Sequence, residues 1–146
     1  MGLFDFLKSK PKIKSDFIPG IGELIFSSEL EESAYRGKIN LANLEYKTEV
    51  VFPCDNKDIS DYQISYFKEI DKNIKEILDF AAKMQDSKIE LSKCKVICIM
   101  IPDRENISYD IDSEIVINQK EKNNIYGKSI YSLIMDKLKV VEIITI

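Results

Sequence analysis

Residues 58–84 read DISDYQISYFKEIDKNIKEILDFAAKM. Apolar side chains recur there at steps of three and four residues, which predicts one amphipathic α-helix. These positions are Ile59, Tyr62, Tyr66, Ile70, Ile74, Ile77, Leu78, Ala81 and Met84. At the start, Ser60 and Gln63 have the spacing of a capping box. A helix of roughly 25 residues is ~37 Å long, so we expect it to lie across a whole sheet face.

The segments on either side of this helix predict β-strands. Most of them alternate apolar and polar residues, which is typical of a strand with one buried face. In order, they are residues 21–28, 35–41, 44–50, 94–101, 114–118, 128–135 and 139–146. Ala42 and Asn43 alone separate the second strand from the third, which predicts a tight hairpin. Cys94–Ile101 is apolar on both sides, which predicts a central strand covered on both faces.

Together these elements predict an α+β fold. We expect a single antiparallel sheet of about six or seven strands with one long amphipathic helix packed across a face. With 146 residues, 45% of them hydrophobic, the chain has enough material for one core. Residues 15–146 are therefore predicted to form a single α+β domain, and residues 11–19 an extended connector into it.

Charge separates the N-terminal residues from the rest of the chain. Four lysines and one aspartate give residues 1–14 a net charge of +3, and because the whole chain carries −4, residues 15–146 carry −7. Residues 1–14 are thus a basic N-terminal segment in front of an acidic body. An acidic body disfavours nucleic-acid binding, which depends on neutralising phosphates with Lys and Arg.

The sequence favours a cytoplasmic protein. No apolar run approaches the ~18 residues that cross a bilayer, and charges interrupt the N-terminal MGLFDFLK, unlike the apolar core of a signal peptide. Two amphipathic turns at residues 1–8 bury too little for stable membrane anchoring. An odd number of cysteines, three, suits a reducing compartment better than a disulfide framework.

The residue inventory predicts no catalytic group, cofactor or metal. The chain has no histidine, which excludes Ser-His-Asp and Cys-His arrangements and every zinc site that uses histidine. It also lacks a Gly-rich phosphate loop. Cys54 has no histidine partner and is expected to be structural or simply exposed. Cys94 and Cys98 share a face of the predicted strand and are expected to be core residues.

One acidic run has part of the spacing of a calcium loop. Asp110, Asp112, Glu114 and Glu121 fall at positions one, three, five and twelve of such a loop. However, Ile115 stands where the loop requires Gly, and the flanking segments predict strands instead of helices. We therefore expect a solvated acidic strand edge and not a calcium site.

Several residues before the helix carry a family resemblance. Gly22-Glu23-Leu24 is followed by Tyr35-Arg36-Gly37, by a third strand at residues 44–52, and by a helix that opens shortly before Gln63. Over residues 20–84 this order resembles a group of small uncharacterised bacterial domains with a Gly-x-Leu strand, an aromatic-x-Gly strand and a long helix. Tyr35 stands where that pattern has Trp. Some members resemble immunity proteins of toxin systems, which implies a protein partner and supplies no catalytic residues.

We expect a non-enzymatic binding protein, most concretely an immunity-type protein that occludes a cationic toxin domain. The candidate partner-binding residues are Glu29, Glu31, Glu32, Tyr109, Asp110, Asp112 and Glu114. Clustered carboxylates accelerate association with a basic partner, and aromatic residues anchor interfaces. Two alternatives stay open: a structural or accessory protein that assembles through a sheet edge or the N-terminal helix, and an unrecognised enzyme. The sequence predicts no particular oligomeric state.

Overall fold

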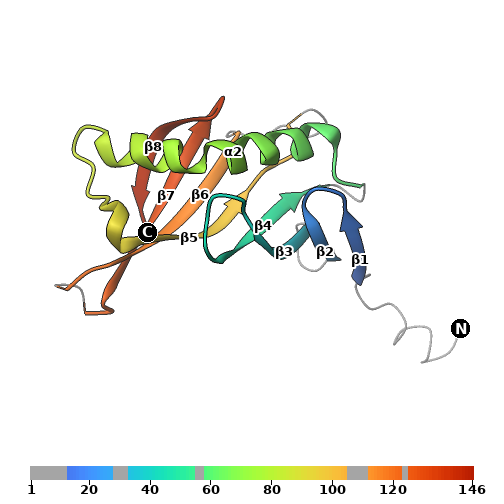
Figure 1. Cartoon of the computed structure of the whole chain (residues 1–146), viewed down its shortest axis with the longest axis horizontal. Coiled ribbons are helices and arrows are strands. Elements are labelled where there is room, and N and C mark those ends of the chain that lie inside the picture. The colour runs from blue at the N-terminus through green and yellow to red at the C-terminus, as the bar shows by residue number, and fades with distance from the viewer. Residues whose placement is uncertain (1–12, 28–32, 55–57, 105–111, 123–124) are drawn as a thin grey trace, which may run out of the picture.

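The computed structural model describes residues 13–27, 33–54, 58–104, 112–122 and 125–146. Its elements are, in chain order, β1 Ile13–Ile18, β2 Gly22–Ser27, β3 Ala34–Asn40, β4 Lys47–Pro53, α2 Asp61–Lys83, the short 3-10 helix η1 Leu91–Lys93, β5 Cys94–Met100, β6 Ser113–Lys120, β7 Lys128–Asp136 and β8 Lys139–Thr145. They form one eight-stranded sheet in which each strand lies beside its neighbours in sequence. The predicted α+β class is therefore confirmed, and α2 crosses the sheet on one side (Figure 1).

Two details of the predicted sheet are wrong. The sheet has eight strands instead of six or seven, because residues 13–18 of the expected connector pair with β2 as an edge strand. This strand includes the last two residues of the predicted N-terminal segment. The sheet is also mixed, since β4 and β5 run parallel while the other described pairs are antiparallel. The cause is α2, whose 23 residues return the chain along the sheet before β5 begins.

The predicted helix and its start signal are confirmed. Ser60 accepts a hydrogen bond from the Gln63 amide, and the Gln63 side chain accepts one from the Ser60 amide, so the capping box is complete. Gln63 is also fully buried, where its Nε2 donates to the carbonyls of Pro53 and Ile101 at 2.8 and 2.9 Å. One side chain thereby caps the helix and ties it to the adjacent ends of β4 and β5.

The core lies between α2 and the sheet. The buried positions of α2 are Gln63, Phe67, Ile70, Ile74, Ile77, Leu78 and Ala81. Phe67 packs edge-on against Phe52 of β4, with ring centroids 6.0 Å apart. The sequence pattern placed Tyr62 and Tyr66 on the apolar stripe, but both are only half-buried and lie beside the buried positions of α2. The helix phase is therefore shifted slightly from the predicted stripe at its first two turns.

The predicted two-residue hairpin between β3 and β4 is also wrong. Residues 41–46 form a longer loop. Leu41 is 2% exposed in the core, and the Ala42 amide donates to Asp71 of α2 at 2.8 Å. Asn43 donates to the Asp71 carbonyl at 3.2 Å. These contacts hold residues 41–46 against the helix, so the loop does not pair in the β3–β4 ladder. The alternation of apolar and polar residues does not predict such contacts.

Strand β5 carries a bulge that changes which way its cysteines point. Its register with β6 shifts between Val96 and Cys98. Cys94 and Val96 lie on the side of α2, whereas Cys98 pairs with Val116 on the opposite side. The prediction that Cys94 and Cys98 share a core face is therefore wrong, and both are only partly buried. Ile97, beside the bulge, is 38% exposed, so this strand is not covered on both faces as expected.

Candidate partner-binding face of the sheet

The strand register divides the sheet into a face under α2 and a face that we call the open face. Residues paired across strands point to the same side. One row of paired residues on the open face runs Ile25, Arg36, Val51, Met100, Glu114, Ile134 and Glu142, from β2 to β8. A second row runs Lys38, Glu49, Cys98, Val116, Ser132 and Ile144, from β3 to β8. Among the described residues, α2 is the sole α-helix, and it lies on the other face.

The open face keeps large apolar side chains in contact with solvent. Phe17 is 73% exposed and Ile25 is 50% exposed near one end, and Ile144 is 42% exposed at the other. Met100, Val116 and Ile134 lie between them and are half-buried. A sheet face that only met water would be mainly polar. A non-obligate protein interface is about as apolar as the rest of a protein surface, so this mixture of apolar and charged groups is compatible with one.

Charged side chains surround the Cys98 thiol at the centre of this face. Burial raises the pKa of Cys98 from 9.0 to about 11, with further raising by Glu49 and Glu114 and an opposing effect of Arg36. The thiol therefore stays protonated at neutral pH, and the thiolate is the form that acts as nucleophile. Glu114 also accepts a hydrogen bond from the nearly buried hydroxyl of Ser132.

Only two of the seven predicted partner-binding residues lie within the described parts of the chain. Glu29, Glu31, Glu32, Tyr109 and Asp110 fall outside them. Glu114 stands on the open face, and Asp112 immediately precedes β6.

The side chain of Asp112 is buried and bound by other residues of the fold. It is 7% exposed, forms an ion pair with Arg104, and accepts a hydrogen bond from the Lys137 amide at 2.8 Å. Lys137 and Leu138 form the β7–β8 turn with φ values of 48° and 66°, a conformation that costs a non-glycine residue roughly 1–2 kcal/mol. The Leu138 amide donates to the Tyr66 hydroxyl of α2 at 3.3 Å. Asp112 and Tyr66 thus hold a strained turn, a role that no sequence signal indicated.

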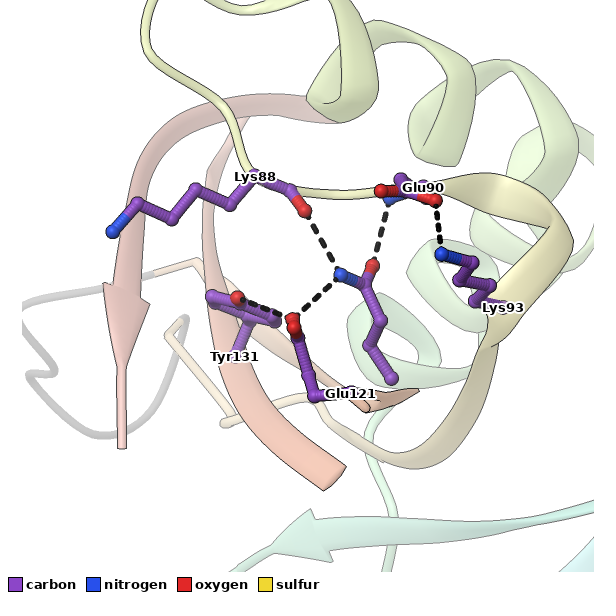
Figure 2. Close-up of polar contacts among 6 residues, drawn as sticks. Lys88, Glu90, Lys93, Glu121 and Tyr131 are labelled. Carbon is purple, nitrogen blue, oxygen red and sulfur yellow. Dashed lines mark hydrogen bonds and ion pairs between the residues drawn. The ribbon is translucent and has the colours of Figure 1, made fainter. Parts of the chain in front are cut away.

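A second buried polar cluster lies at the far end of β6. The Gln119 side chain is 2% exposed, accepts from the Glu90 amide at 2.7 Å, and donates to the Lys88 carbonyl at 2.9 Å. It also donates to Glu121, which accepts from Tyr131 as well, and Figure 2 shows these groups converging. The cluster anchors the connection between α2 and β5 onto the sheet. Its polar groups are hydrogen-bonded to one another, so we infer that the cluster stabilises the fold.

A cleft lies between α2 and the β3–β4 loop. It has a volume of about 720 Å³ and a mixed lining, with apolar residues that include Leu44, Leu78 and Leu91 and charged residues that include Lys75 and Asp79. The Tyr46 hydroxyl accepts from the Val96 amide at 2.9 Å, and Lys95 lies over the Tyr46 ring, so this aromatic is held by its own neighbours. Within the described ranges no cluster of three or more metal-ligating side chains occurs, and no helix is long and apolar enough to cross a membrane.

No protein-family model, curated protein or solved structure matches this chain. The resemblance to small bacterial domains therefore stays a prediction. The structure does assign physical roles to its residues: Leu24 is fully buried and packs against Gly37, and Gln63 joins α2 to two strands.

Proposed function

We propose that the chain is a non-enzymatic protein-binding module whose open face contacts the partner. Most concretely, it is an immunity-type protein of the bacterial cytoplasm that occludes a toxin domain. The observation that supports this proposal is the row from Ile25 to Glu142, in which apolar and charged side chains share one face across seven strands and are exposed or half-buried apart from the buried Val51. Rigid sheet positions present such groups with little loss of conformational entropy on binding.

The chemistry of the polar groups supports a non-enzymatic role. The Cys98 thiol is held protonated by burial and by two glutamates. Gln63 and Gln119, the buried amides, have their hydrogen-bonding groups occupied by the fold. Asp112 is paired with Arg104 and the β7–β8 turn. These groups stabilise the domain instead of converging on a site for a reacting molecule.

Electrostatics supports a cationic partner. Residues 15–146 carry a net charge of −7. The two rows of the open face hold Glu49, Glu114 and Glu142 on β4, β6 and β8, while their cations, Arg36 and Lys38, are confined to β3. Negative charge near a contact surface accelerates association with a basic protein and has less effect on dissociation. The acidic residues Glu29, Glu31, Glu32 and Asp110 remain predicted contributors to this negative field.

The alternative is a structural or accessory protein that assembles through a sheet edge. Strands β1 and β8 are the two edges of the described sheet. The register between β7 and β8 shifts between Ile134 and Met135, and Val141 of β8, at this irregularity, is 55% exposed. Bulges of this kind oppose regular pairing with another strand. We therefore favour the open face over the β8 edge.

The proposal is tested by affinity capture with two matched variants. The tagged chain is recovered from bacteria that naturally express it, alongside Ile144→Asp on the open face and Phe80→Asp on α2. Both residues are exposed apolar side chains, at 42% and 51%, so each change adds the same charge to a similar surface. We expect Ile144→Asp to lose the co-purifying protein and Phe80→Asp to retain it. Equal retention by both variants, each folded by circular dichroism, would contradict the proposal.

A growth assay tests the proposed immunity role separately. The captured partner is expressed in a heterologous bacterium with and without the chain. We expect growth arrest by the partner alone and recovery when wild-type chain is present, with recovery lost for Ile144→Asp. A partner that does not impair growth would favour the accessory role.

A further inference from the structure

Strand β2 pairs with its two neighbours over unequal lengths. It pairs with β1 from Gly22 to Ser27, but with β3 only through Ile25–Ser27 opposite Ala34–Arg36. Strand β3 nevertheless continues to Asn40 and pairs with β4 along its whole length. Within the described part of the chain, Gly37–Asn40 therefore has no strand partner on its β2 side.

Gly37 explains why the two strands separate at this point. A Cβ on this glycine would lie 2.7 Å from the Glu23 carbonyl oxygen and 2.8 Å from the Leu24 side chain. Because Gly37 pairs with Val50 of the core, β2 crosses β3 on the side of α2. The absence of a side chain permits this close crossing. On the open side the same divergence leaves a cleft between the strands.

The cleft is lined by both strands and by Lys47 of β4, with a volume of about 590 Å³. This volume falls within the ~300–1,000 Å³ typical of ligand sites. Arg36, Lys38 and Lys47 line it and are exposed, whereas Glu23 is the one carboxylate in its lining. Glu49 faces Lys38 across the β3–β4 ladder outside the cleft. The cleft is thus basic, in a body whose net charge is −7.

Backbone geometry indicates what such a cleft accepts. Alternate residues of a strand direct their N–H and C=O groups to opposite sides, so half of the segment Gly37–Asn40 presents these groups toward β2. Unpaired ladder groups are a template for an added strand. A bound strand would place every second side chain on the face that carries Arg36 and Lys38. Acidic residues at those positions would meet the three cations.

We propose that Gly37–Asn40 of β3 binds an extended acidic segment of a partner protein as an added strand, with its carboxylates on Arg36, Lys38 and Lys47. This site goes beyond the proposed function, because it assigns an extended acidic peptide to the β2–β3 end of the open face, where Arg36 and Lys38 lie. Its test uses a synthetic peptide, so the two proposals fail or succeed separately.

The probe is a fluorescein-labelled peptide of alternating glutamate and valine. We expect its binding to raise fluorescence anisotropy and to shift the backbone amide resonances of Gly37, Lys38 and Ile39. Lys38→Glu should weaken binding by about tenfold, since it replaces an attraction by a repulsion. Lys72→Glu, which makes the same charge change at an exposed position of α2, should leave the affinity within about twofold. Both variants are compared at equal ionic strength and after a check of folding.

Four results would overturn the proposal. The first is equal binding of a lysine–valine peptide, which would remove the role of charge. The second is unchanged affinity when alternate peptide amides are N-methylated, because strand addition needs those donors. The third is full displacement by millimolar inorganic phosphate with amide shifts confined to Arg36, Lys38 and Lys47, which would show a simple anion site. Concentration-dependent dimerisation that blocks the cleft would assign it to a second copy of the chain.

Discussion

The two faces of this sheet have the same strands and opposite chemistry. Beneath α2, paired positions such as Ile99, Ile115 and Leu133 are fully buried and apolar. On the open face, the neighbouring residues of the same strands are Met100, Glu114 and Ile134, which are half-buried and mixed in character. Packing against the helix accounts for the first set. The second set has no such explanation within the described residues, and the proposed partner of the open face would supply one.

The largest expected difference between the faces is energetic. Ile74 is fully buried in α2, so Ile74→Ala should lower the free energy of unfolding by about 2–5 kcal/mol through lost burial and a residual cavity. The same truncation at Ile144 on the open face should cost less than about 1 kcal/mol, close to the scale of surface substitutions. Urea denaturation measures both. A similar cost at the two sites would show that the open face is packed against part of the chain itself.

A smaller contrast separates the two acidic residues that the sequence singled out. Asp112→Ala removes the acceptor of the Lys137 amide and leaves Arg104 without its carboxylate, so it should cost about 1–3 kcal/mol. Glu114→Gln on the open face keeps an acceptor for Ser132 and should change stability by less than about 0.5 kcal/mol. Thermal unfolding of both variants checks this. Equal losses would mean that Glu114 is also part of the fold.

A third prediction concerns the thiol reactivity of Cys98. With its pKa raised from 9.0 to about 11, Cys98 has about a hundredfold less thiolate at pH 7–8 than an ordinary thiol. In a Cys54→Ala, Cys94→Ala background, iodoacetamide should therefore react slowly, about tenfold faster per pH unit until the pH nears 11. Because Glu49 and Glu114 add to the shift caused by burial, replacing both with Gln should move the profile to lower pH. A plateau near pH 9 in the parent chain would contradict this.

The fold was predictable where the signals are local. The spacing from Ile59 to Met84 and the Ser60–Gln63 pair located α2 and its capping box correctly. The hairpin of β7 and β8 also follows from alternation around Asp136. Each of these signals depends on residues within a few positions of one another, so pattern and propensity suffice.

The sequence predictions were wrong where contacts between residues distant in sequence determine the local structure. The loop at residues 41–46 is drawn onto Asp71 of the helix, and the β5 bulge reverses Cys98 relative to Cys94. The parallel pairing of β4 with β5 follows from the path of α2. In each of these three cases, the residues concerned carry no local sequence pattern that predicts the observed structure.

The candidate site was predictable only in part. Acidic composition indicated a charged surface, and Glu114 does lie on the open face. The structural role of Asp112 depends on Arg104 and on the β7–β8 turn, which is 25 residues away in sequence. The open face itself emerges from the register of eight strands, and the apolar residues on it have the same sequence pattern as core residues.

Site-specific photo-crosslinking tests most directly whether the open face is the binding surface. A benzophenone-bearing amino acid replaces Val116 at the centre of the open face or, as the matched control, the exposed Phe80 on α2. Both chains are expressed in the organism that naturally carries the protein and irradiated there. We predict that Val116 yields one discrete covalent adduct with another protein and that Phe80 yields none. An adduct from Phe80 with none from Val116 would place the partner on the helix and contradict this account.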